Sequence, residues 1–184
     1  YGLFLYVDGA RCGYGLAAPD NDVQLTDLAQ LCDAFSIGGT KVGALLGEAV
    51  VLPNPALQRD FRYMVKRQGG MLAKGRLLGI QFEVLFEDGL YFQLGRHGVE
   101  LALQLRRTFE DCGVELAYPS FTNQQFPILT RSQWAELSKS YAFSHWQDLD
   151  GDRIMLRVCT SWATQPQAVE QLCRDIRRVC GGAV

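Results

Sequence analysis

Two short segments near the amino terminus carry the residue types of a covalent catalytic site. Asp8 follows the apolar run 3–7, and Lys41 lies in the glycine-rich stretch 38–43 that follows a second apolar run. A lysine amine can condense with the aldehyde of pyridoxal phosphate (PLP) to form a Schiff base, and a carboxylate facing the pyridine nitrogen keeps that nitrogen protonated. Asp8 and Lys41 are therefore candidate catalytic partners, if the fold brings them together.

The elements that must position this pair form one βαβ unit. Residues 3–7 are a continuous apolar run, which is typical of a strand covered on both faces. Apolar residues at helical spacing follow in 25–32, and residues 34–37 predict a second strand. A right-handed crossover sets two such strands side by side with their carboxyl ends at one edge of the sheet. We expect Asp8 and Lys41 at that edge, where open α/β sheets bind ligands.

Each residue of the pair also has an ordinary structural explanation. An aspartate that ends a strand more often caps a helix or anchors a loop, and a lysine in a glycine loop is usually solvated. Gly38, Gly39 and Gly43 would let the backbone turn sharply and leave room for a flat cofactor. The combination of residues, rather than either one alone, favours a PLP site.

An arginine far along the chain offers a partner for the carboxylate of an amino acid. Arg157 follows the apolar residues 154–156, which predict a strand. The guanidinium fork can donate two parallel hydrogen bonds to a carboxylate. Without further information, an arginine that alternates with apolar residues on an edge strand more often points to water.

These segments resemble the threonine aldolase and aromatic amino acid β-eliminating lyase family of PLP-dependent enzymes. The resemblance rests on Val7-Asp8-Gly9-Ala10-Arg11 and on residues 37–44, and it continues through 66–70 and 123–127 to 154–162. It covers nearly the whole chain. It implies an α/β fold made of the end of the fold type I (aspartate-aminotransferase-like) large domain and a small carboxy-terminal α/β domain.

The resemblance implies a role for five residues. Lys41 would be the Schiff-base lysine, and Asp8 the partner of the pyridine nitrogen. Arg11 would lie beside the ring oxygen and the substrate carboxylate, and Arg157 would clamp that carboxylate. Arg67 matches a position near the cofactor phosphate or the site of a neighbouring subunit. We expect no metal site, because the six cysteines lack CxxC or CxH spacing and the two histidines are isolated.

The implied reaction is cleavage of a β-hydroxy-α-amino acid, such as threonine or allo-threonine, to glycine and an aldehyde. The same electron sink permits β-elimination or racemisation, because the bond that breaks is the one held perpendicular to the cofactor ring. These reactions stay open as alternatives. So does a non-catalytic domain whose long helices serve assembly.

The resemblance also bears on what lies outside this chain. In the family, an amino-terminal part supplies the phosphate-binding loop and the aromatic residue stacked on the cofactor ring, and the sites lie at subunit interfaces. A parallel strand without a neighbour on one side exposes backbone groups and apolar surface. We therefore expect a carboxy-terminal fragment that is inactive alone, that needs the missing amino-terminal part, and that belongs to a homodimer or homotetramer.

Composition is that of an ordinary soluble protein. The 184 residues are 48% hydrophobic and 21% charged, with a formal net charge of −2, which is enough apolar material for a real core. We expect no nucleic acid partner because no basic patch is present, and no membrane association because no apolar run is long enough. Without a signal peptide at the start, and with six scattered cysteines read as reduced thiols, the expected location is the cytoplasm.

The remaining segments complete the expected organisation. The predicted parts are the end of the PLP-binding domain in 1–55, connecting helices in 56–112 and the small α/β domain in 113–184. Further strands are predicted at 48–52 (antiparallel), 114–117, 126–129 and 154–158. Helices are predicted at 55–65, 74–86, 91–112, 132–138 and 165–179, with a loop at 12–23 and a solvated turn at 148–152.

Overall fold

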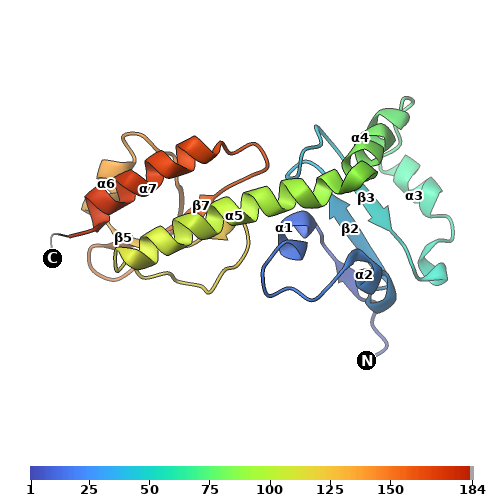
Figure 1. The fold of residues 1–184 in the computed structure, drawn as a ribbon. Coiled ribbons are helices and arrows are strands. Elements are labelled where there is room, and N and C mark those ends of the chain that lie inside the picture. The colour runs from blue at the N-terminus through green and yellow to red at the C-terminus, as the bar shows by residue number, and fades with distance from the viewer. Residues whose placement is uncertain (183–184) are drawn as a thin grey trace. The chain divides into compact units, whose positions relative to one another are not determined.

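The computed structural model describes residues 1–182, which fall into two compact units. The first unit contains Tyr1–Leu16 and Asn21–Gly95, and the second contains Ala17–Asp20 and the chain from Arg96 onward. Each unit has its own sheet (Figure 1). The predicted division at residues 55 and 112 stays a prediction.

The first unit is built on a three-stranded sheet in the order β1 (Tyr6–Val7), β2 (Ala34–Gly38) and β3 (Glu48–Val51). β1 runs parallel to β2, and β3 runs antiparallel to β2. All five residues of β2 are buried, as expected for a central strand. These pairings confirm the predicted βαβ unit and the predicted antiparallel return strand.

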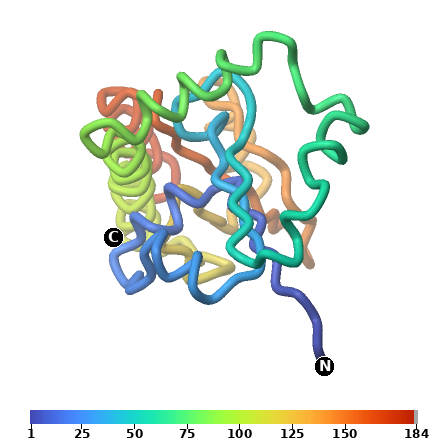
Figure 2. The backbone as a smooth tube through the Cα atoms, turned by 90° about the vertical axis from the view of Figure 1, so that its right-hand side faces the viewer, coloured from blue at the N-terminus to red at the C-terminus, as the bar shows by residue number. Residues whose placement is uncertain are grey.

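β1 is shorter and more exposed than its sequence indicates. The apolar run 3–7 predicts a strand covered on both faces, but only Tyr6 and Val7 pair with β2. Leu3 is 84% exposed and Phe4 is 63% exposed, and in Figure 2 the chain before β1 leads away from the sheet as an extended tail. The burial that the apolar run predicts is wrong here, because no element among residues 1–182 covers these side chains. The exposed apolar surface expected of a strand without a neighbour on one side is present instead.

Two short helices connect β1 to β2, namely α1 (Cys12–Leu16) and α2 (Leu25–Leu31). α2 confirms the predicted helix, and the Gln24 N–H donates to the carboxylate of Asp27 in its first turn (2.8 Å). α1 falls inside the predicted loop, so that prediction is wrong. A helix of five residues that includes two glycines has no recognisable apolar period and a poor intrinsic helix propensity.

Helices dominate the chain after β3. Their bounds are η1 (Pro55–Leu57), α3 (Phe61–Arg67), α4 (Arg76–Phe86), η2 (Glu87–Gly89) and α5 (Leu90–Asp111). α4 and α5 confirm the two predicted long helices. The single helix predicted at 55–65 is instead a 3₁₀ turn and a separate helix, because Asp60 adopts a left-handed conformation (φ 56°) between them.

The second unit has a four-stranded antiparallel sheet centred on β7 (Arg153–Cys159). Its partners are β4 (Gln124–Gln125), β5 (Ile128–Thr130) and β6 (Ser144–Asp148). β7 confirms the predicted strand. The strand predicted at 126–129 is interrupted, since Pro127 cannot donate to a ladder and separates β4 from β5.

Two predictions for the second sheet are wrong. Residues 114–117 do not form a strand and contribute a single bridge, between Leu116 and Pro127. β6 has no counterpart in the sequence-based prediction, because all five of its residues are exposed and carry no apolar alternation. The turn predicted at 148–152 is present as the connection from β6 to β7.

One face of this sheet forms the core of the second unit. Ile154, Leu156 and Val158 alternate along β7 and are at most 5% exposed. They pack with apolar side chains of α5 and of α7 (Pro166–Cys180), which lies along the sheet in Figure 1. α6 (Arg131–Leu137) starts with a capping box between Thr130 and Gln133. None of the helices described is both long and apolar enough to cross a membrane.

Candidate active site

The segment after β1 stays attached to the end of β2 by buried hydrogen bonds. The Gly38 N–H donates to the Gly9 carbonyl (2.9 Å), and the Gly9 N–H donates to the hydroxyl of Ser36 (3.1 Å). The residue before Gly9 is Asp8, and the lysine loop (residues 39–47, between β2 and β3) begins directly after Gly38. The structure thus brings the segments that carry Asp8 and Lys41 to the same edge of the sheet.

Glycine is required where these two segments touch. A Cβ atom on Gly9 would lie 1.8 Å from the Ser36 carbonyl oxygen, and one on Gly38 would lie 2.6 Å from the Ala10 carbonyl oxygen. No side chain fits in either place, so the close approach of the two backbones depends on both glycines.

The glycines around Lys41 lie in tightly packed surroundings. The missing Cβ of Gly39 would contact Ala44 and Phe82 at 2.8 and 2.9 Å, and that of Gly43 would contact Leu94 at 2.9 Å. A Cβ at either position would therefore meet protein atoms, so both glycines permit close packing of the lysine loop, and the expectation that they leave room for a cofactor stays a prediction. Gly43 does provide the expected sharp turn, with a φ of 106°.

Two buried tyrosines tie the lysine loop to α1 and α5. The Tyr14 hydroxyl donates to the Lys41 carbonyl. The Tyr91 hydroxyl donates to the Gly38 carbonyl (3.0 Å) and accepts from the Gly13 N–H (3.1 Å). Burial raises the pKa of Tyr91 above its ordinary value, so this phenol stays neutral and remains a donor.

Sequence reasoning misses both of these tyrosines. The Tyr14 contact spans 27 residues, and the Tyr91 contacts span 53 and 78 residues. No motif in the sequence marks either tyrosine. Tyr14 lies in a segment without an apolar period, and a tyrosine in a helical pattern such as that of Tyr91 does not identify its hydrogen-bond partner.

Asp8, Arg11 and Lys41 each have polar atoms that could bind a ligand. Asp8 is exposed, and one carboxylate oxygen accepts from the Ala10 N–H (3.0 Å), which anchors the loop. Arg11 is half-buried, and its Nε is buried without a hydrogen-bond partner among the described residues. Lys41 is also half-buried, and no carboxylate of residues 1–182 pairs with its amine.

Arg157 and Arg67 lie elsewhere in the chain. Arg157 belongs to the second unit, where its Cζ is 5.1 Å from the centre of the Trp146 ring and its Nε is buried without a partner among residues 1–182. Arg67 is exposed in the last turn of α3, outside the hydrogen-bonded segments described above. Its role near a phosphate or a second subunit stays a prediction.

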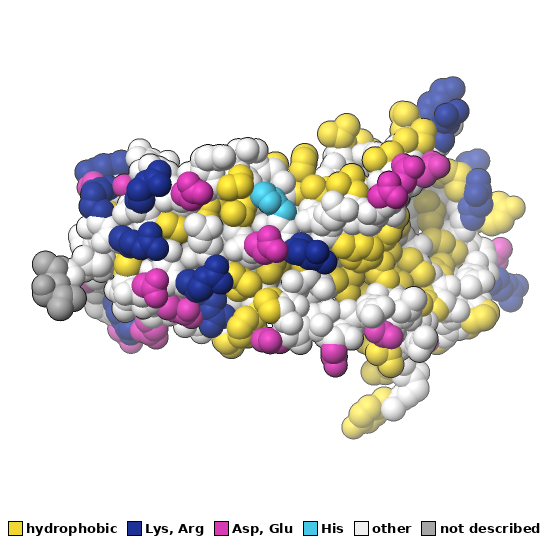
Figure 3. All heavy atoms as spheres, in the orientation of Figure 1, with side chains coloured by type: hydrophobic (Ala, Val, Ile, Leu, Met, Phe, Trp, Pro, Cys, Tyr) yellow, Lys and Arg dark blue, Asp and Glu magenta, His cyan; other side chains and the backbone are white. Residues whose placement is uncertain are grey.

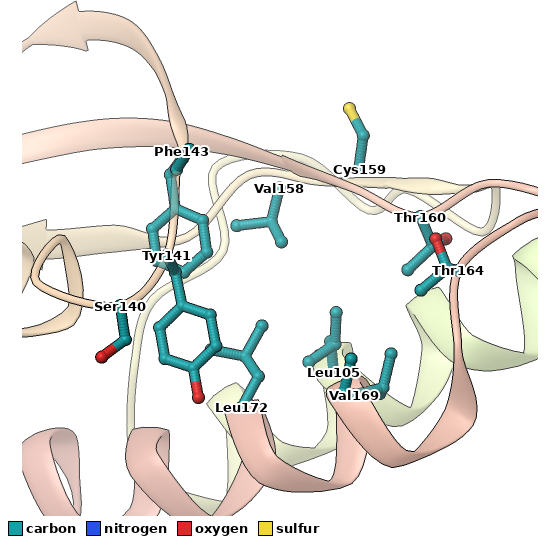
Figure 4. A pocket seen from close by; sticks show the side chains of 12 residues that line it. Leu105, Ser140, Tyr141, Phe143, Val158, Cys159, Thr160, Thr164, Val169 and Leu172 are labelled. Atoms are coloured by element: carbon teal, nitrogen blue, oxygen red, sulfur yellow. The ribbon is translucent and has the colours of Figure 1, made fainter.

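A separate cavity of about 260 Å³ lies in the second unit between β7, α7 and the segment 140–143. Figure 4 shows its largely apolar lining, with Thr160 and Thr164 close together at one end and Tyr141 at the other. None of the predicted site residues lines it. Within the part of the chain that the structure describes, no three His, Cys, Asp or Glu side chains gather as metal ligands would.

The chain resembles threonine aldolases over nearly its whole length. It is 33% identical over 97% of its residues to a low specificity L-threonine aldolase of Pseudomonas sp. (strain NCIMB 10558), and 31% identical over 98% to one of Pseudomonas aeruginosa. A threonine aldolase structure from Leishmania major matches with a TM-score of 0.95 at 42% identity, over 97% of this chain and 52% of that one. The chain is homologous to the carboxy-terminal half of threonine aldolases. It spans 51% of each curated relative.

More distant structures share the fold alone. A serine palmitoyltransferase from Sphingomonas wittichii matches with a TM-score of 0.65 at 15% identity, over 97% of this chain and 47% of that one. The fold is therefore that of the carboxy-terminal part of fold type I enzymes, which confirms both the resemblance and the fold class expected from the sequence. No family model matches the chain.

Proposed function

We propose that the intact protein to which this chain belongs is a PLP-dependent lyase that cleaves threonine-like β-hydroxy-α-amino acids to glycine and an aldehyde. The observation that carries this proposal is the attachment of the Asp8 segment to the lysine loop through Gly9 and Gly38 (2.9 Å). The names of the relatives support the substrate class, since both curated ones are low specificity L-threonine aldolases.

An amine, a carboxylate and a guanidinium, the groups that a PLP site needs, are all present at this edge of the sheet. Lys41 would hold the cofactor through its amine and Asp8 through a charge contact to the pyridine nitrogen, and the buried Nε of Arg11 lacks a partner that an anionic oxygen would supply. When bound, PLP withdraws electrons from the substrate Cα. The aldol reaction also needs a base for the β-hydroxyl proton, and we assign no residue of this chain to that task.

Two arginines are proposed to bind the substrate carboxylate. Among the described residues, Arg11 and Arg157 are the arginines whose Nε is buried without a hydrogen-bond partner. A buried donor left unpaired is costly, and a carboxylate can accept two parallel hydrogen bonds from one guanidinium. The chemistry thus supports an amino acid substrate.

The test is the product profile of the intact protein with threonine, allo-threonine and phenylserine. We expect glycine and the matching aldehyde, and we expect Lys41→Ala to abolish both. Lys74→Ala is the matched control, because this exposed lysine of the first unit has no proposed role and the variant should keep full activity. A Lys41→Ala protein that still releases glycine contradicts the proposal.

The competing functions give different products. A β-eliminating enzyme would release ammonia and a 2-oxo acid, a racemase would leave the substrate intact but of mixed chirality, and an assembly domain would bind no cofactor. A homodimer or homotetramer, a cytoplasmic location and inactivity of the 184-residue chain by itself remain part of the proposal. Adding PLP and threonine to the isolated chain tests the last point, and any aldehyde released would contradict it.

A further inference from the structure

Trp146 lies at an irregularity in the pairing of β6 with β7. Ser144 is opposite Arg157 and His145 is opposite Leu156, but the register then shifts and Gln147, not Trp146, takes the next position. Trp146 is therefore the extra residue of a β-bulge, a feature that re-aims a side chain. Its ring lies under the guanidinium of Arg157, with 5.1 Å from Cζ to the ring centre.

The ring of Trp146 also contacts a row of aromatic side chains. Phe126 packs edge-on against it with ring centres 5.3 Å apart, and Tyr118 packs edge-on against Phe126 at 5.1 Å. Tyr118 follows α5, and Phe126 lies between β4 and β5. The indole of Trp146 is thus packed between Arg157 and Phe126, and Tyr118 supports Phe126 in turn.

A contact of this kind uses the face of the guanidinium and leaves its edge free. The cation is attracted to the electron-rich face of the indole, while every N–H of arginine points outward in the guanidinium plane. The Nε of Arg157 is buried and has no hydrogen-bond partner among the described residues. One face of this side chain is therefore held, while at least one buried donor on its edge is unpaired.

We propose that Trp146, braced by Phe126 and Tyr118, is a positioning residue that sets the guanidinium plane of Arg157 for a substrate carboxylate. This inference rests on the proposed function in one respect, namely that the ligand of Arg157 is the carboxylate of an amino acid. This role would account for the bulge beside Arg157 and for the position of Trp146, which is 46% exposed.

The test measures binding of glycine to the intact, cofactor-loaded protein by NMR of the Arg157 Nε–H, assigned by its loss in Arg157→Lys. We expect Trp146→Leu to weaken glycine binding about tenfold, which lies between the values for an exposed and for a desolvated cation–π contact. The variant should also move the Nε–H signal in the ligand-free protein. Trp146→Phe keeps an aromatic face and should weaken binding by a smaller factor. For turnover of threonine, KM should rise with little change in kcat.

Phe121→Leu is the matched control. Phe121 stacks on a different arginine of the same unit, with the Cζ of Arg106 4.6 Å from its ring centre, and the proposal gives that pair no role. This variant should bind glycine as the unmodified protein does. Equal weakening in Phe121→Leu and Trp146→Leu would overturn the proposal, because it would indicate a general loss of structure.

The outcomes separate this inference from the proposed reaction. If Arg157→Lys weakens glycine binding and Trp146→Leu does not, the positioning role is wrong whatever the reaction. If both variants weaken binding in a protein that releases no aldehyde from threonine, the positioning role is supported and the proposed reaction is wrong. Unchanged binding in Arg157→Lys would overturn the inference outright.

Discussion

Gly9 is the single residue on which the geometry of the candidate site depends most directly. A Cβ atom there would lie 1.8 Å from a backbone oxygen of β2, which no side-chain rotation can relieve. We expect Gly9→Ala to lower the free energy of unfolding by at least about 2 kcal/mol, since overpacking against backbone forces the strands apart.

Gly15→Ala is the matched control for this substitution. Gly15 lies in α1, and a Cβ there would meet no atom within 4 Å. Alanine favours the helix by about 0.5–1 kcal/mol over glycine, so this variant should be as stable as the unmodified chain or more so. Urea unfolding of both variants measures the difference, and equal stability would contradict the close contact at Gly9.

Asp175 makes stability in the second unit dependent on pH. Hydrogen bonds from Tyr141, Gln171 and Arg178 lower the pKa of its carboxyl to about 2, from an ordinary value of 3.8. A lowered pKa means that the folded state prefers the ionised carboxylate, so this stabilisation is present at neutral pH and is lost as the pH falls from about 4 to about 2.

Tyr141→Phe tests this linkage, because the Tyr141 hydroxyl is the main cause of the lowered pKa. The variant should be less stable than the unmodified chain at pH 7, and the gap should close below pH 2. Unfolding by urea at pH 7, 4 and 2 measures it. The Tyr118 hydroxyl makes no such contact with residues 1–182, so Tyr118→Phe should show no pH-dependent gap. A gap of constant size for Tyr141→Phe would exclude Asp175 as its source.

At the scale of elements, Tyr91 joins α5 to two segments of the site. Tyr91→Phe removes a hydroxyl that accepts from Gly13 and donates to Gly38, and it leaves both buried backbone groups without that partner. We expect a loss of about 1–3 kcal/mol in the free energy of unfolding, with faster hydrogen exchange at Gly13. Tyr63→Phe is the control, since Tyr63 is 74% exposed and should change stability by less than about 0.5 kcal/mol.

The elements that the sequence predicts well are those with a strong apolar pattern. β2, β7, α4, α5 and α7 are long or fully buried, so periodicity identifies them. β6 escapes prediction because its five residues are all exposed and it is stabilised by pairing with β7. α1 escapes because hydrogen bonds from distant elements, rather than its own propensity, hold it.

The same distinction applies to the candidate site. The placement of the Asp8 and Lys41 segments at one edge of the sheet is predictable, because a βαβ unit brings the carboxyl ends of its two strands together. The role of Arg11 is implied by the family resemblance alone, and the roles of all three residues stay predictions. Tyr91 and Trp146 are not predictable, because their roles come from contacts that only the folded chain creates.

At the scale of the whole molecule, the first unit exposes a large apolar surface. Leu77, Ile80 and Val84 follow one face of α4 and are 61%, 40% and 49% exposed. Figure 3 shows apolar side chains gathered on the face of this unit turned to the viewer. A large exposed apolar surface marks a site of interaction with another molecule, or it promotes self-association of the chain.

We expect the isolated 184-residue chain to associate with itself and to bind a hydrophobic dye. The double variant Leu77→Gln with Val84→Gln should lower both effects, as measured by sedimentation velocity and dye fluorescence, while Lys74→Gln should change neither. Sedimentation of the unmodified chain as a single 20.5 kDa species at all concentrations would contradict this expectation.

The hydrogen bond from Tyr91 to Gly38 also limits when the lysine loop can be completed during translation. Gly38 leaves the ribosome 53 residues earlier than Tyr91. Synthesis adds roughly 5–20 residues per second, so a nascent chain carries its lysine loop without this contact for roughly 3–10 seconds. During translation, the candidate site therefore cannot reach its final form until the first turn of α5 has emerged.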